Sequence, residues 1–66
     1  PQLMATALTE AGEAAHQILD GEQSIELGPQ ASFVRKLQHQ LAERYNLASA
    51  SAGREPRRRV IIYQPD

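Results

Sequence analysis

The run Val60-Ile61-Ile62-Tyr63 is the feature that most restricts the fold of this 66-residue chain. Four consecutive β-branched or aromatic residues, closed by Pro65, predict a strand over Arg58 to Gln64 with little solvent on either face. Ser24 to Leu27 alternates polar and apolar residues, and Leu47 to Ser51 is a weaker candidate that is rich in alanine and serine. The sequence therefore predicts a sheet of three strands.

Two amphipathic helices account for most of the remaining chain. Apolar residues recur at steps of three and four from Leu3 to Leu19, and Gly21 can take the left-handed position that ends such a helix. The second helix is expected from Pro29 to Tyr45, because proline suits the first helical position, and Asn46 marks its end. The order helix, strand, helix, strand, strand predicts a single α+β domain over residues 1–66, with two helices packed on one face of the sheet.

The second helix separates its polar and apolar residues. At about 100° per residue, Val34, Leu37 and Leu41 share one stripe. Arg35 and His39 lie roughly opposite that stripe and are neighbours as an i, i+4 pair, so we expect both side chains to be exposed. This pattern fits an ordinary solvated face, and it also fits a nucleic-acid site. Arginine suits phosphate, and histidine can donate to a phosphate or stack on a base.

Charge is distributed unevenly along the chain. Residues 1–30 contain five acidic residues and no Lys or Arg, whereas residues 31–66 contain seven basic and three acidic residues, so −5 and +4 give the net charge of −1. The run Arg57-Arg58-Arg59, with Arg54 nearby, either charges a sheet edge or clamps a nucleic-acid backbone. Alternation along a strand would send Arg57 and Arg59 to one side and Arg58 to the other, so the three cannot share one site.

Small polar residues provide further candidates. The segment from Ser49 through Ser51 to Gly53 is either a turn or a source of hydroxyl and backbone contacts to phosphate. The weaker candidates for nucleic-acid contact are Ser32, Lys36, Ser49 and Arg54.

Several other classes of site are disfavoured. The chain has no cysteine, which excludes disulfides, thiolate zinc sites and a cysteine nucleophile, and fits a reducing, cytoplasmic location. The two histidines lie 23 positions apart with scattered carboxylates, so we expect no metal and no cofactor, and His16 is expected to be structural. A pairing of His39 with Ser32 or with Glu43 lacks an orienting group and a pocket, so we expect no enzymatic activity.

No apolar run approaches the length of a membrane span. The start at Pro1 suggests a piece of a longer protein.

The pattern Arg35-x-x-x-His39 lies inside an amphipathic helix. Together with the serine-, glycine- and arginine-containing segment that follows, it resembles the R-3-H domain. That family is named for an arginine and a histidine separated by three residues. The resemblance covers residues 24–64 well, and the segment after the helix matches at Leu47, Ser49, Ser51, Gly53, Pro56, Arg58, Arg59 and Val60 to Ile62. Membership would imply binding of single-stranded DNA or RNA with little sequence preference and no catalysis by the module itself. It would make Arg35 and His39 the signature pair, with Ser51 and Arg58 at the family's polar positions after the helix.

The resemblance also suggests a context. The chain looks most like bacterial, cyanobacterial-type sequences in which the module follows an AAA-type ATPase domain. We therefore expect a binding module for single-stranded nucleic acid, and the alternative is a protein-interaction or regulatory domain that docks on a neighbouring ATPase domain. The residues expected to bind nucleic acid are Arg35, His39, Ser51, Arg57, Arg58 and Arg59.

Overall fold

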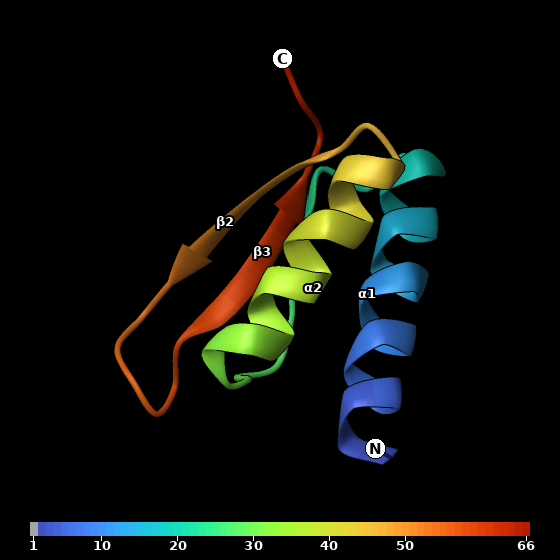
Figure 1. Cartoon of the computed structure of the whole chain (residues 1–66). Helices are drawn as coiled ribbons and strands as arrows, with labels where there is room; N and C mark the ends of the chain where they lie inside the picture. The colour runs from blue at the N-terminus through green and yellow to red at the C-terminus, as the bar shows by residue number, and fades with distance from the viewer. Residues whose placement is uncertain (1) are drawn as a thin grey trace.

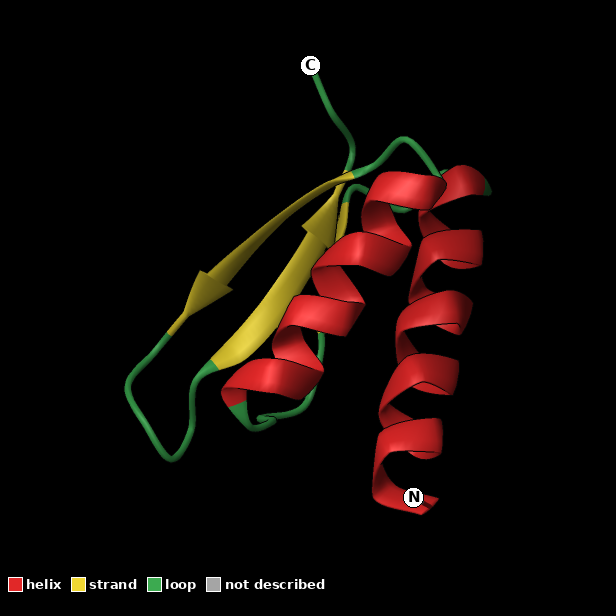
Figure 2. Ribbon diagram, in the orientation of Figure 1, coloured by secondary structure: helices red, strands yellow, loops and turns green. Residues whose placement is uncertain are grey.

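Two helices cover one face of a three-stranded sheet in the computed structural model, which describes residues 2–66 (Figure 1). The strands are all antiparallel and have the spatial order β1-β3-β2, so the last strand of the chain is the central one. Figure 2 shows both helices on the same side of the sheet. The elements are α1 (Gln2–Leu19), β1 (Ser24–Glu26), α2 (Ser32–Arg44), β2 (Ala48–Ala52) and β3 (Arg59–Tyr63). The predicted α+β architecture and its element order are confirmed.

The start of α2 differs from the prediction. The helix begins at Ser32 rather than at Pro29, because the preceding segment still runs beside β3. The Leu27 amide donates to the Val60 carbonyl at 2.8 Å, and the Gln30 amide donates to the Arg58 carbonyl at 3.2 Å. The chain turns into the helix only after these two bonds. This extended segment also places the Gln30 carbonyl where it accepts a hydrogen bond from the Arg35 side chain.

The helix ends follow the predicted signals. Gly21 has a φ of 125° just after α1, and Asn46 has a φ of 59° just after α2. Both values lie in the region that glycine and asparagine tolerate better than most residues. The Leu47 amide then donates back to the Ala42 carbonyl at 3.0 Å, so β2 begins one residue later than expected.

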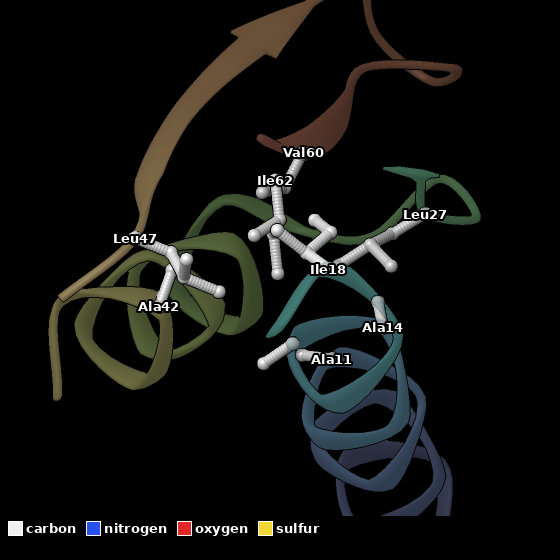
Figure 3. Close-up of a cluster of buried hydrophobic side chains, with 9 residues drawn as sticks. Ala11, Ala14, Ile18, Leu27, Ala42, Leu47, Val60 and Ile62 are labelled. Carbon is white, nitrogen blue, oxygen red and sulfur yellow. The ribbon is translucent and has the colours of Figure 1, made fainter. Parts of the chain in front are cut away.

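The core is small and lies between the two helices and the sheet (Figure 3). Helix α1 contributes mainly alanines at three- and four-residue steps, and such short side chains let helices and sheet approach closely. Ile18 of α1 and Val60 and Ile62 of β3 are fully buried and fill the centre. No helix in residues 2–66 is long and apolar enough to cross a bilayer.

The expectation that β3 meets little solvent on either face is wrong. Val60 and Ile62 face the helices with no exposed surface, whereas Ile61 is half-buried and Tyr63 is 38% exposed. Figure 2 shows both helices on one side of the sheet, and Val60 and Ile62 point into the core on that side (Figure 3), so the other face remains open within the described residues.

The buried face of α2 is also rotated from the predicted one. Val34, Arg35, Gln38 and Ala42 are buried, while Phe33 is 58% exposed and Leu37 and Leu41 are only half-buried. The cause is tertiary, because α2 packs against α1 on one side and against β2 and β3 on the other. The expectation that Arg35 and His39 are both exposed is therefore wrong, since only 8% of the Arg35 surface is accessible and His39 is half-buried.

Candidate nucleic-acid interface

One open surface cavity of about 630 Å³ gathers most of the predicted residues. Its walls come from α2, from β2 and from the residue that precedes β3. Its lining residues are Ser32, Arg35, Lys36, His39, Gln40, Glu43, Leu47, Ser49, Ser51 and Arg58. The cavity thus unites the signature pair with a serine pair and one of the three consecutive arginines.

Arg35 is held in place by two oxygen acceptors. Its Nη1 donates to the Gln30 carbonyl at 2.6 Å and forms an ion pair with the Glu55 carboxylate at 3.0 Å. Both contacts use Nη1, which leaves Nε and Nη2 as further donors of the same planar guanidinium. Because the side chain also lines the cavity, its guanidinium adds a fixed positive charge beside any anion that enters.

His39 lies between two serine hydroxyls of β2. Its Nδ1 is 2.7 Å from the Oγ of Ser49, and its Nε2 is 2.8 Å from the Oγ of Ser51. Alternate residues of a strand share one face, which is why Ser49 and Ser51 both reach the ring. Direct donation from His39 to a phosphate would require one of these bonds to break. The geometry instead makes His39 a residue that orients two hydroxyl groups.

Two causes keep the His39 ring neutral near pH 7. Burial is the larger one, and the neighbouring Arg35 cation is the second, and together they lower the pKa of His39 below its ordinary value of 6.5. A neutral imidazole donates through one nitrogen and accepts through the other. One serine therefore gives its hydrogen to the ring, and the other keeps its hydrogen for a ligand.

Arg58 joins this cavity, and its two neighbours do not. The Nη1 of Arg58 donates to the Gly53 carbonyl at 2.7 Å. The alternation expected along the strand is observed, because Arg59 lies on the other face and pairs with Glu26. Arg57 and Arg54 are exposed in the loop between β2 and β3 and do not line the cavity. Contacts of Arg54, Arg57 and Arg59 with nucleic acid remain predictions that would need a longer interface.

The donors of the cavity suit phosphate better than a metal ion. Guanidinium, ammonium and hydroxyl groups donate hydrogen bonds, and phosphate oxygens accept them. No group of three or more acidic or histidine side chains in residues 2–66 is arranged to hold a metal. His16 lies outside the cavity and meets Tyr45 edge-on, with ring centroids 5.4 Å apart and the Tyr45 hydroxyl 3.3 Å from Nε2.

The partners that fix Arg35 were not predicted from the sequence. The Gln30 carbonyl could not be found from the sequence, because a backbone acceptor has no side-chain signal. Glu55 had a weak signal, since it is the only acidic residue in the arginine-rich segment 54–59. Its pairing depends on how the loop before β3 folds back toward α2.

Comparison with known proteins agrees with this geometry. The family profile of the R-3-H domain matches residues 6–64. The chain is also 43% identical over 58 residues to a protein of Porphyra purpurea named "Uncharacterized protein ycf45". That match covers 86% of this chain but 10% of the relative, so the chain spans about a tenth of the relative's length.

Domains of this family are generally nucleic-acid-binding modules. The matched region contains both helices from Thr6 onward, all three strands and every residue that lines the cavity. The protein therefore belongs to the R-3-H domain family.

Proposed function

We propose that this chain binds single-stranded DNA or RNA by seating a backbone phosphate in the cavity between α2 and β2. One observation carries the proposal: Arg35, Arg58 and the two serines oriented by His39 converge on a single open cavity. Contacts to the phosphate backbone bring little sequence information, so we expect weak sequence preference.

The position of the basic residues favours a single strand over a duplex. Proteins that read duplex DNA often insert a protruding helix into the major groove. In this fold Arg35 is nearly buried and its guanidinium is held by Gln30 and Glu55 of neighbouring segments, so α2 cannot present it inside a groove. A flexible single strand can instead bring one phosphate to the cavity mouth.

A hydrolytic role fits the same residues less well. The contact of Ser51 with His39 has the distance of a nucleophile and its base. However, the orienting position at Nδ1 holds the neutral hydroxyl of Ser49 rather than a carboxylate, and the lowered pKa makes His39 a weaker base. We therefore propose a binding role for the module without catalysis of its own.

Binding can be tested by fluorescence anisotropy with labelled oligothymidylate and oligouridylate at low salt. Arg58→Gln removes a cavity donor, and Arg57→Gln is the matched control, since it removes the same charge from the adjacent exposed position. A charge-assisted contact is worth about 1.5–3 kcal/mol, so Arg58→Gln should weaken binding at least about tenfold. Arg57→Gln should change affinity less than about threefold.

Ser51→Ala gives a second test that leaves the net charge unchanged, with the exposed Ser24→Ala as its control. Absence of oligonucleotide binding by the unaltered chain at low salt would refute the proposal. Equal losses for Arg57→Gln and Arg58→Gln would show that the cavity is not the site.

The relative's greater length bears on the whole protein. We propose that the module works in the cytoplasm beside an ATPase domain of a longer chain, as the family resemblance suggests. Docking on such a domain through the acidic side of α1 would be tested by Glu13→Lys, because Glu13 is exposed. Glu10 is unsuitable, since its carboxylate accepts a bond from the Gly28 amide at 3.2 Å. Loss of co-purification with intact oligonucleotide binding would support docking.

A further inference from the structure

We propose that Phe33 and the apolar groove beside it form a stacking site for one nucleobase of the bound strand. The inference rests on the proposed function, because the base belongs to the same strand whose phosphate occupies the cavity. It adds a second contact of a different chemical kind to that site.

Phe33 lies in the first turn of α2 and is 58% exposed. It does not belong to the buried core cluster, so its ring is available to a ligand. The groove beside it has a volume of about 620 Å³ and a mostly apolar lining. Met4, Pro29, Phe33, Val34, Glu55 and Pro56 are among its lining residues.

The groove and the phosphate cavity are neighbours. Ser32 lines the cavity, and Phe33, the next residue, lines the groove. The ion pair of Arg35 with Glu55 joins the two sites, because Arg35 lines the cavity and Glu55 lines the groove. A phosphate and the base of an adjoining nucleotide could therefore be held on opposite sides of this ion pair.

The fold brings both sites to one end of the molecule. In Figure 1 the start of α2 lies near the N-terminal end of α1 and on the same side as the loop between β2 and β3. A strand that reaches Arg58 at this loop thus passes close to the first turn of α2.

Other exposed aromatic rings are less suited to this role. Tyr63 is 38% exposed but lies on the open face of the sheet, away from the helices and the cavity. Tyr45 is engaged with His16 at the opposite end of α2. Base stacking on an aromatic ring tolerates any base, which agrees with a phosphate site of low sequence preference.

The test compares two probes with the same number of phosphates. One is an oligothymidylate, and the other is an abasic oligonucleotide of equal length that keeps the sugar–phosphate backbone. Phe33→Ala should weaken binding of the oligothymidylate about tenfold, within the range for stacking of one base. The affinity of Phe33→Ala for the abasic strand should differ from that of the unaltered chain by less than about twofold.

Two further variants make the result specific. Phe33→Trp should retain affinity, and fluorescence of the introduced indole should be quenched by the oligothymidylate but not by the abasic strand. Leu19→Ala is the matched control, because Leu19 is 54% exposed and lies at the C-terminal end of α1. This substitution should leave both affinities unchanged.

Equal affinity of Phe33→Ala and the unaltered chain for the oligothymidylate would overturn the stacking site. So would an equal loss for both probes, which would point to a change in the protein rather than a lost base contact. If Arg58→Gln still weakened binding in either case, the proposed function would stand while this inference fell.

Discussion

His39 lies between two serine hydroxyls and one helical turn from Arg35, so we expect its protonation to be coupled to an anion bound in the cavity. Lys36 and Glu43 of α2 and Arg58 before β3 line the same cavity and add their charges to its surroundings. Burial and the Arg35 cation lower the pKa of His39 in the free chain. A phosphate bound as proposed would offset the repulsion from Arg35, so we expect the pKa of His39 to be higher in the complex than in the free chain.

Oligonucleotide affinity should consequently rise as the pH falls. The complex has the higher pKa and binds more protons than the free chain, so affinity increases through the pKa of the complex and levels off below the pKa of the free chain. Titrations between about pH 8 and pH 5 would measure this. His39→Asn should abolish the dependence, and His16→Gln should keep it, because His16 lies outside the cavity. A flat profile for the unaltered chain would exclude this coupling.

Glu55 places a negative charge beside the arginine that is proposed to meet the phosphate. Its carboxylate is 59% exposed and pairs with the nearly buried Arg35. Glu55→Gln removes that charge and keeps a polar side chain of similar shape, so we expect oligonucleotide binding to strengthen about two- to fivefold at low salt. Glu13→Gln makes the same change of net charge on the exposed side of α1 and serves as the control. Weaker binding by Glu55→Gln would mean that Glu55 chiefly positions Arg35.

At the scale of elements, α2 shows what local periodicity could and could not predict. The existence of α2 and its end before Asn46 follow from the sequence. Its buried face does not, because apolar periodicity favours Leu37 and Leu41, whereas packing on two sides buries Arg35 and Gln38 instead. The separation of Arg58 from Arg59 agrees with the period-two alternation expected from the sequence, whereas Arg57 lies in the loop before β3. Features that depend on one helix or strand alone could therefore be predicted, whereas the burial of side chains between elements could not.

Gln38 is the polar residue that the contact between the helices buries completely. Its Nε2 donates to the Ala7 carbonyl of α1 at 3.1 Å, while its Oε1 has no hydrogen-bond partner among the described residues. The Ala7 carbonyl lies within α1, where the helical ladder provides its own donor. Gln38→Met keeps the volume and removes the unsatisfied oxygen, so we expect the free energy of unfolding to rise by about 1 kcal/mol.

The measurement is urea or thermal unfolding of the chain. A gain of about 1 kcal/mol would raise the melting temperature of a domain of this size by about 4–8 °C. Gln38→Ala removes the same oxygen but leaves a cavity, and it should lower the free energy of unfolding by about 2 kcal/mol. Destabilisation by Gln38→Met equal to that of Gln38→Ala would show that the bond to Ala7 outweighs the unpaired oxygen.

For the whole molecule, the fold was easier to predict than the charge pattern on its surface. The net charges of −5 and +4 on the two segments describe the chain, but they do not say which charges remain available to a ligand. Folding pairs Arg59 with Glu26 and Arg35 with Glu55, and each pair joins residues that are distant in sequence. Such pairings depend on register and on loop conformation, so fewer arginines remain unpaired in the folded state than the composition suggests.

This partial neutralisation predicts a modest salt dependence of binding. Arg35, Lys36 and Arg58 are the basic residues that line the cavity. Each phosphate contact to a single strand contributes about 0.7 to the slope of log affinity against log salt, so the slope should be near about −2. Titrations with oligothymidylate between about 25 and 200 mM salt would measure it. Arg58→Gln should make the slope shallower by about 0.7, and Arg57→Gln should leave it unchanged. A slope steeper than about −4 would mean that Arg54, Arg57 and Arg59 also contact the strand, and the interface would then extend from the cavity along the loop between β2 and β3.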